Sequence, residues 1–104
     1  MCGILGLYDN SNLNINRFKK SLDLLSHRGP DNKSIKNISN NLIFGHTRLS
    51  IIDLQDSSNQ PFSINDSYHI VFNGEIFNYI EIRKELIELG YNFKTNGDTE
   101  VLKL

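Results

Sequence analysis

Residues 1–8 of the chain read MCGILGLY, so an apolar run begins almost at the first residue. The turn-forming stretch DNSNLN follows directly at residues 9–14. A short apolar run bounded by turn signals predicts a buried strand over residues 3–8. Such a strand would fix the chain end in a core, at a position where most chains fray. Cys2, the only cysteine of the chain, would then be held still beside that strand.

Helices are predicted at three places further along the chain. Residues 15–25 carry apolar side chains at helical spacing, and Asn14 before them suits the N-cap. Residues 79–89 show a similar spacing and stop at Gly90, a residue type that commonly ends helices. A third helix begins at residues 98–99, an Asp-Thr pair suited to an N-cap, and continues through the last residues.

Extended segments are predicted between these helices. The sequence favours a hairpin of residues 33–37 and 42–46 across NISNN, an extended stretch over residues 48–54 (RLSIIDL), and a loop over residues 55–62. Residues 68–79 hold a strand that ends at the turn dipeptide Asn73-Gly74, followed by a short second run. Several short strands with two or three helices predict a layered α/β or α+β domain.

Composition limits the class of protein. The 104 residues suffice for one small domain or part of a larger one, and the 38% hydrophobic content argues against disorder. The net charge of -1 gives no basic field that would favour nucleic acid or an anionic membrane. The sequence contains no membrane-spanning apolar run and no signal peptide pattern, and its single cysteine favours the reducing cytosol. Since the chain stops inside an apolar-periodic stretch, we expect it to be part of a longer chain.

The position of Cys2 is compatible with two roles. If Met1 is removed, the α-amino group of Cys2 lies next to its own thiol. An α-amine has a pKa of about 7.7–8.0 and a thiol about 8.5, so the amine can serve as base for a nucleophile near neutral pH. Gly3 would favour this role by letting a ligand approach the backbone closely. The alternative is a buried cysteine that packs as a small hydrophobe, the commoner role of a lone cysteine.

Four other residues carry groups that an acyl-transfer site needs, and each also has a structural explanation. Asn73 offers a side-chain amide and Gly74 an unobstructed N–H for an oxyanion, although Asn-Gly is commonly a hairpin turn. Arg48 can bind a carboxylate through two parallel hydrogen bonds, or can be a surface charge. Asp98 can hold an ammonium group, or can cap the last helix.

The three histidines do not point to a metal site. His27, His46 and His69 lack the spacing of metal ligands, so no metal is predicted. His46 is instead expected to pack or to form a local hydrogen bond. The sequence also lacks a Ser-His-Asp pattern and a phosphate-binding glycine loop. The residues alone therefore lead to an N-terminal cysteine nucleophile, without a substrate.

Six short motifs extend this interpretation through a family resemblance. In chain order they are MCGILG, SHRGPD, HTRLSIIDL, NQPF, NGEIFNY and GDTEV. Their order resembles that of the class II, N-terminal-nucleophile glutamine amidotransferases, and is most similar to the glutaminase domain of glutamine-hydrolysing asparagine synthetases. The match extends over essentially all 104 residues. MCGI alone is unspecific, whereas RGPD, RLSIID and NGEIFNY in register are specific, and RLSIIDL is closer to the asparagine synthetase type than to other members of the class.

The resemblance implies a role for each candidate residue. Cys2 would be the nucleophile that attacks the side-chain amide of glutamine, with its α-amino group as general base. Asn73 and Gly74 would form the oxyanion hole. Arg48 would bind the α-carboxylate of glutamine and Asp98 its α-ammonium group. The remaining contacts of the glutamine site would come from Leu49, Ser50, Ile51, Ile52 and Glu75.

The resemblance also implies a fold and a larger protein. The expected fold is α+β, a four-layer αββα sandwich of the N-terminal-nucleophile hydrolases, of which residues 1–104 would be the N-terminal portion. RGPD and QPF would shape loops near the pocket. A C-terminal synthetase domain, absent from this segment, would bind ATP and Mg²⁺ and activate aspartate. No cofactor is expected in the segment itself, and the resemblance also allows a homodimer in the cytosol.

Two alternatives to glutamine-dependent asparagine synthesis stay open. The same glutaminase chemistry could deliver ammonia to another acceptor, such as a sugar or a peptide of a biosynthetic cluster. The domain could also be non-catalytic and act by binding or regulation, in which case Met1 would stay attached or the thiol of Cys2 would be unreactive.

Overall fold

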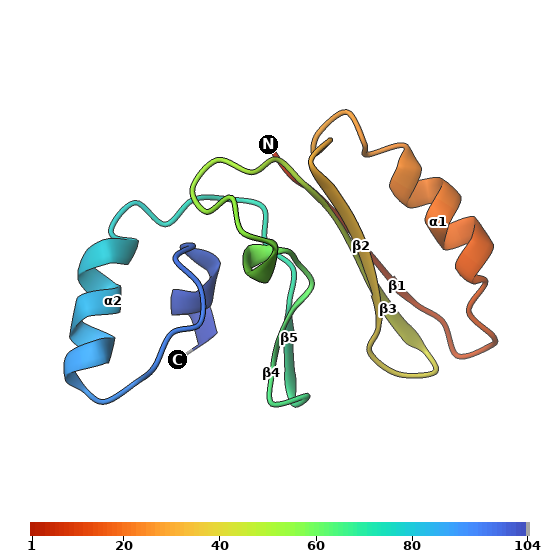
Figure 1. The fold of residues 1–104 in the computed structure, drawn as a ribbon. Coiled ribbons are helices and arrows are strands. Elements are labelled where there is room, and N and C mark those ends of the chain that lie inside the picture. The colour runs from red at the N-terminus through yellow and green to blue at the C-terminus, as the bar shows by residue number, and fades with distance from the viewer. Residues whose placement is uncertain (104) are drawn as a thin grey trace.

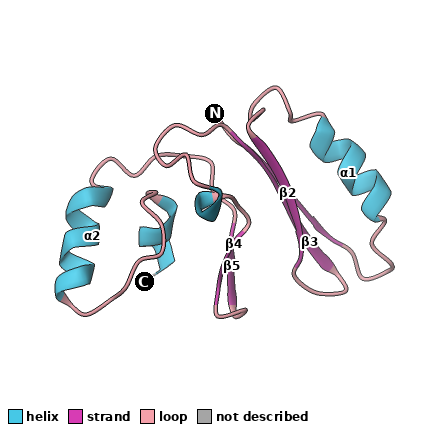
Figure 2. Cartoon of the chain, viewed as in Figure 1, coloured by secondary structure: helices cyan, strands magenta, loops and turns pink. Residues whose placement is uncertain are grey.

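The structure, a computed structural model, describes residues 1–103. Within these residues the chain forms two antiparallel sheets with helices beside them, an α+β arrangement (Figures 1 and 2). The elements in order are β1 (Gly3–Tyr8), α1 (Ile15–Asp23), β2 (Asn32–Asn37), β3 (Leu42–Arg48), the 3₁₀ turn η1 (Asp56–Ser58), β4 (Phe62–Ile64), β5 (Tyr68–Ile70), α2 (Tyr79–Glu88) and the 3₁₀ turn η2 (Thr99–Lys103).

The larger sheet contains the chain start. Its strand order is β1-β3-β2, with Gly3 opposite Thr47 in one ladder and Asn32 opposite Arg48 in the other. The predicted strand over residues 3–8 and the predicted hairpin are therefore confirmed. The strand β1 is an edge strand, however, and several of its apolar side chains are exposed rather than buried: Ile4, Leu7 and Tyr8.

One face of β3 packs against α1. Phe18 and Leu22 of α1 are buried, and a Cβ built on Gly45 would come within about 3 Å of both side chains. Ile43 is fully buried on the same face, and the Thr47 hydroxyl donates to the Leu25 carbonyl at 3.1 Å. Because successive side chains of a strand alternate between faces, residues 44, 46 and 48 point to the opposite side, away from α1.

The predicted helix over residues 15–25 is confirmed at its start and is shorter at its end. The Asn14 side chain accepts a hydrogen bond from the Arg17 N–H at 3.1 Å, as expected of an N-cap. The helix ends at Asp23 because the next turns tighten into i to i−3 bonds, such as Leu25 N–H to the Leu22 carbonyl at 2.9 Å.

The region after β3 differs from two predictions. Its sheet is a hairpin of β4 and β5 that turns at Asn65 and Asp66, both with positive φ (49° and 54°), a conformation that these two residue types tolerate. The predicted hairpin turn at Asn73-Gly74 is wrong, because β5 already ends at Ile70. The predicted extended stretch over residues 48–54 is also wrong, since residues 49–55 form no strand.

The C-terminal part contains α2 and η2. The predicted helix over residues 79–89 is confirmed as α2, with Leu89 as C-cap and Gly90 at φ +95°, where glycine avoids strain. The predicted third helix is a short 3₁₀ turn that starts at Thr99. Leu104, the last residue of that prediction, lies outside the described residues.

The elements are arranged in layers (Figure 1). The helix α1 is outermost on one side, followed by the three-stranded sheet, the β4–β5 hairpin with η2 nearby, and α2 outermost on the other side. The inner face of β3 and the loops around β4 and β5 therefore meet in the middle of the molecule. Within residues 1–103, no helix is long and apolar enough to cross a membrane.

Candidate active site

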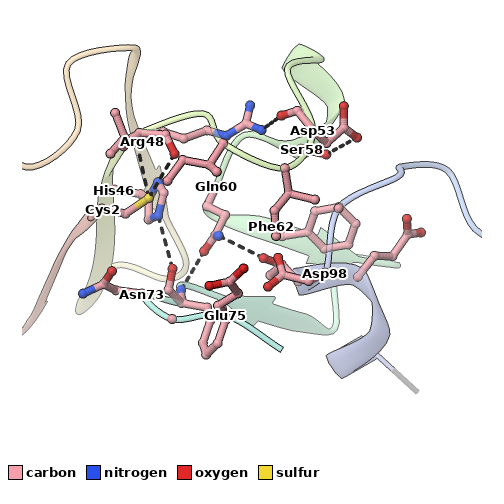
Figure 3. A pocket seen from close by; sticks show the side chains of 18 of the residues that line it. Cys2, His46, Arg48, Asp53, Ser58, Gln60, Phe62, Asn73, Glu75 and Asp98 are labelled. Carbon is pink, nitrogen blue, oxygen red and sulfur yellow. Dashed lines mark hydrogen bonds between the residues drawn. The ribbon is translucent and has the colours of Figure 1, made fainter. Parts of the chain in front are cut away.

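A cavity of about 240 Å³ opens where the larger sheet meets the β4–β5 region (Figure 3). Segments that are far apart in sequence line it: the chain start, the end of β3, the loop after it, residues 72–75 and residues 95–100. The lining contains all but one of the predicted site residues: Cys2, Arg48, Leu49, Ile51, Ile52, Asn73, Gly74, Glu75 and Asp98. The fold thus brings together residues that the motifs left dispersed along the chain.

Cys2 is half-buried and its position is fixed by three contacts. The Leu49 N–H donates to Cys2 Sγ at 3.3 Å, and the thiol lies 3.8 Å from the Leu49 carbonyl oxygen. The Arg28 guanidinium donates through Nε to the Cys2 carbonyl at 2.9 Å. The ladder of β1 with β3 begins at the next residue, with Gly3 opposite Thr47. The thiol is free, and the chain end around it is held in place.

Gly3 does not serve the cavity as predicted. A Cβ at Gly3 would come 2.5 Å from Thr47 Oγ1 and 2.9 Å from Leu25 Cβ, so the space beside it is already filled by side chains behind the sheet. The prediction that Gly3 admits a ligand is therefore wrong. Met1, by contrast, lines the cavity beside Cys2 and is 69% exposed. An α-amino group on Cys2 requires that Met1 be removed.

Arg48 is only 7% exposed, so the alternative prediction that it is a surface charge is wrong. Its guanidinium turns toward the loop after β3. There Nη1 donates to the Gln55 carbonyl at 3.0 Å and to Asn59 Oδ1 at 2.8 Å, and Nη2 donates to the Asp53 carbonyl. Among the described residues these bonds leave Nε–H and one hydrogen of Nη2 without a partner. Arg48 therefore shapes the cavity wall and has N–H groups that these bonds do not use.

The segment 73–75 is anchored at its first end through Phe72. The Phe72 N–H donates to the buried side chain of Gln60, at 2.6 Å from Oε1. The Phe72 carbonyl lies 3.4 Å from His46 Nε2. The Phe72 ring packs on Gly74, where a Cβ would come within 2.7 Å of Cζ. Two side chains from different strands or loops thus fix the main chain just before Asn73.

The same segment is anchored at its other end by Asp98. Asp98 Oδ2 accepts a hydrogen bond from the Ile76 N–H at 2.9 Å, and the residue is 8% exposed. Its side chain therefore does not cap η2, although its carbonyl accepts from the Val101 N–H at 3.2 Å. In the described part of the chain, Oδ1 has no hydrogen-bond partner. Asp98 thus uses one carboxylate oxygen to hold the Ile76 N–H, and it lines the cavity with the other left without such a bond to the described residues.

His46 packs as expected, but its hydrogen bond is not local, because it goes to Phe72, 26 residues further along the chain. The imidazole is fully buried, and burial lowers its pKa below the ordinary value of about 6.5, with nearby Arg48 acting in the same direction and the Phe72 carbonyl opposing. Nδ1 has no hydrogen-bond partner among the described residues. His46 is therefore a neutral side chain with a single polar contact there, to Phe72.

Asp53 is a buried carboxylate that sequence reasoning missed. It accepts hydrogen bonds from the Gln55 N–H at 2.9 Å, the Ser58 hydroxyl at 2.7 Å and the Asn96 N–H at 2.8 Å. The Ser58 hydroxyl, followed by the Gln55 N–H, holds the pKa of Asp53 below its usual range. Asp53 thereby joins the loop that receives the Arg48 guanidinium to residues 95–97 on the far side of the cavity.

The SHRGPD motif acts behind the cavity. Besides the bond from Arg28 to Cys2, Asp31 Oδ2 accepts from the Ser50 N–H at 2.7 Å. Ser50 is the one predicted site residue that does not line the cavity. The expected shaping role of RGPD is thus seen in two defined hydrogen bonds. Nothing in the spacing of the motif could have revealed them, because both partners lie far away in sequence.

The acidic and basic side chains of the cavity do not form a metal centre. No group of three or more His, Cys, Asp or Glu side chains within residues 1–103 is arranged to hold a metal ion. What the arrangement offers is a fixed thiol, retained donors on Arg48, a retained carboxylate oxygen on Asp98 and an anchored Asn-Gly segment. This set suits a zwitterionic substrate whose carbonyl faces a nucleophile.

Comparison with known proteins agrees with this chemistry. The family model described as a glutamine amidotransferase domain matches residues 1–104. Asparagine synthetase (glutamine-hydrolyzing) 1 of Bacillus subtilis is 43% identical over 108 residues, which cover 98% of this chain and 17% of that protein. Asparagine synthetase B (glutamine-hydrolyzing) of Escherichia coli is 35% identical over 98% of this chain and 19% of that protein.

A relative with a different name shares the same region. The amidase chry2 of Gibberella zeae is 39% identical over 90 residues, covering 85% of this chain and 13% of that protein. The chain therefore spans less than a fifth of the length of each of these relatives. Since the family model matches its whole length, the chain belongs to the glutamine amidotransferase domain family.

Proposed function

We propose that this segment hydrolyses the side-chain amide of glutamine through Cys2 and supplies the ammonia for synthesis of asparagine from aspartate. The observation that carries the proposal is the single cavity in which Cys2, Arg48, Asn73, Gly74 and Asp98 meet. The similarity to glutamine-hydrolysing asparagine synthetases over 98% of the chain supports the same reaction.

Glutamine would be bound by its two charges. The retained donors of Arg48 would bind the α-carboxylate, and the retained oxygen of Asp98 would accept from the α-ammonium group. Two fixed opposite charges orient a zwitterion and so place its side-chain amide near the thiol. The rest of the glutamine site is proposed to come from Leu49, Ser50, Ile51, Ile52 and Glu75, with Ser50 acting through its position behind the wall.

The chemical step would start after removal of Met1. The α-amine of Cys2 would take the thiol proton, and Sγ would attack the amide carbon, moving the carbonyl electrons onto oxygen. Asn73 and Gly74 would stabilise this oxyanion. Collapse would break the C–N bond, with the proton on the α-amine passing to the leaving nitrogen to give ammonia. Water would then attack the γ-glutamyl thioester, giving glutamate and restoring the thiol.

The proposal places the segment within a larger enzyme. Residues 1–104 would form the N-terminal portion of a four-layer αββα sandwich, which the layer order in Figure 1 supports. A C-terminal synthetase part would bind ATP and Mg²⁺, activate aspartate and receive the ammonia. A homodimer located in the cytosol stays a prediction from the sequence.

One observation supports an ammonia acceptor other than aspartate. The amidase of Gibberella zeae shares 39% identity over 85% of the chain, so the same glutaminase part occurs in a protein with another name. In that case the ammonia would be delivered to an acceptor other than aspartate. An acceptor screen on the full-length protein distinguishes the two, because only one acceptor should consume ATP in proportion to the glutamine hydrolysed.

The test of the proposed function is Cys2→Ala in the full-length protein. Loss of the thiol should abolish asparagine formation from glutamine, because no thioester can form, while formation from added ammonium salt continues. A Leu24→Ala variant, altered at a side chain that is 75% exposed and remote from the cavity, serves as control and should keep both activities. Glutamine-dependent synthesis by the Cys2→Ala protein would overturn the proposal.

A further inference from the structure

The segment 73–75, which carries the proposed oxyanion donors, has little support from its own backbone. In the described part of the chain, residues 71–75 make no backbone–backbone hydrogen bond outside the strands. Three side chains hold the segment instead. Gln60 and His46 bind the two backbone groups of Phe72, and Asp98 binds the Ile76 N–H. The position of Asn73 and Gly74 therefore depends on side chains from other parts of the fold.

Among these three, His46 has no other polar contact to explain its presence. It sits in the middle of β3, the central strand, opposite Ile4 of β1 and Ser34 of β2, and is fully buried. Burying an imidazole costs free energy that an apolar side chain would avoid. Because Nδ1 is unpartnered among the described residues, the contact of Nε2 with the Phe72 carbonyl is the polar interaction that remains to offset this cost there.

This contact acts directly on Asn73. The Phe72 carbonyl and the Asn73 N–H belong to one planar peptide unit, so fixing the oxygen fixes the orientation of the N–H and of the next Cα. The Phe72 ring packs on Gly74, which extends the same constraint by one residue. Since the acceptor is a carbonyl, Nε2 must carry the proton, and the imidazole must be the Nε2–H tautomer. The lowered pKa of His46 is in accord with a neutral ring.

We propose that His46 is a positioning residue for the oxyanion hole: its Nε2–H holds the Phe72 carbonyl and thereby sets Asn73 and Gly74 in place for the transition state. This inference rests on the proposed glutaminase function. In Figure 3 a dashed line runs from the His46 imidazole toward the segment that carries Asn73, and it marks the contact of Nε2 with the Phe72 carbonyl. His46 therefore acts through Phe72, and not on glutamine itself.

The test compares three substitutions in the full-length protein. His46→Gln retains an amide N–H at about the reach of Nε2, whereas His46→Asn buries the same group one carbon short of it, and His46→Leu removes the donor. We expect His46→Asn and His46→Leu to lower kcat for glutamine hydrolysis by about 10- to 100-fold, up to the loss that a misplacement of about 1 Å can cause, with KM changed less than about threefold. His46→Gln should stay within about threefold of wild type.

Two controls separate positioning from general damage. His69→Gln alters a histidine of β5 that contacts Ser63 outside the cavity, and should leave kcat unchanged. Alkylation of Cys2 by iodoacetamide should proceed at similar rates in all variants, because Leu49 and Arg28 hold the thiol independently of His46. If His46 had a merely structural role, kcat would not fall selectively in the His46→Asn variant while staying near wild type in the His46→Gln variant.

The outcomes are distinguishable. Wild-type protein without glutaminase activity would overturn the proposed function and this inference together. With an active wild type, His46→Asn at wild-type kcat, or His46→Gln as impaired as His46→Asn, would overturn the positioning role alone. Nitrogen-15 NMR of histidine-labelled wild type gives a test that needs no folded variant: a buried Nε2–H tautomer is expected, and an Nδ1–H tautomer would contradict the inference.

Discussion

The larger sheet and the region after it are stabilised by different interactions. Strands β1, β3 and β2 are joined by continuous main-chain ladders, and the apolar side chains Phe18, Leu22 and Ile43 bury the face toward α1. In residues 49–103 the strands β4 and β5 have three residues each, and α2 has no buried residue. Buried polar side chains dominate there: Asp53, Gln60, Thr95, Asp98 and Glu100.

The difference explains how the site is divided. The sheet region holds the chain end with Cys2 in place and carries the backbone of Arg48. The region after it supplies loops whose backbone is held by side chains, such as residues 73–75. Hydrogen bonds that main-chain N–H groups donate to buried carboxylates position a loop well but give little apolar burial. The second region should therefore be the less stable one.

The largest expected effect is the loss of apolar packing in the sheet region. Leu22→Ala removes a fully buried side chain that packs on Gly45, and should lower the free energy of unfolding of this domain by about 2–5 kcal/mol. Leu24→Ala, two residues away and 75% exposed, should change it by less than about 0.5 kcal/mol. Urea unfolding followed by circular dichroism measures both, and equal effects would contradict an apolar core at this face.

A smaller effect is expected from a buried carboxylate of the second region. Glu100 accepts hydrogen bonds from the Lys94 N–H, at 3.0 Å to one oxygen, and from the Thr95 N–H and hydroxyl, both at 2.7 Å. Glu100→Gln removes the charge that strengthens these bonds and should cost about 1–3 kcal/mol. Amide hydrogen exchange should show the loss in residues 94–103 and not in β1 or β3.

The control for this prediction is Glu88→Gln, at the end of α2 and exposed to solvent. It should leave exchange in residues 94–103 unchanged. If Glu100→Gln raised exchange equally in β1 and β3, the two regions would unfold together, and the contrast between them would fail.

The smallest effect is a pH dependence that arises from Asp53. Its folded-state pKa lies below the unfolded value of about 3.8, so the folded state binds fewer protons in this range. The stabilising contribution of Asp53 is therefore present above about pH 3.8 and is lost as the pH falls through the lowered folded pKa. Asp53→Asn should be less stable than wild type at neutral pH, and the difference should shrink in acid. A difference that does not change with pH would contradict the buried, hydrogen-bonded carboxylate.

The contrast between the regions also explains what the sequence could predict. The elements β1, α1 and α2 and the β2–β3 hairpin arise from local apolar spacing, caps and turn residues, all of which are visible in the sequence. The β4–β5 hairpin was missed because its strands are short and its turn uses Asn65-Asp66 in place of the Asn-Gly pair at residues 73–74. Residues 49–55 form no strand because the buried Arg48 guanidinium donates hydrogen bonds to the carbonyls of Asp53 and Gln55. This is a tertiary interaction.

Tertiary interactions also limit what the sequence could predict about the site. The motifs named the residues that line the cavity, because those residues carry reactive or charged groups of recognisable types. They did not reveal that Arg28 holds Cys2, that Gln60 and His46 hold Phe72, or that Asp53 joins two walls. Bonds between a side chain and a distant backbone group have no sequence period, so only the fold shows them.

The proposed mechanism depends on a fixed chain end that becomes a nucleophile carrying its own base. The most direct measurement is the mass of the N-terminal peptide of the full-length protein, quenched in acid during turnover of glutamine. We expect a peptide that begins at Cys2 without Met1 and that carries a γ-glutamyl group on the thiol. Glutamine hydrolysis by a protein that retains Met1, or with the γ-glutamyl group on another residue, would contradict it.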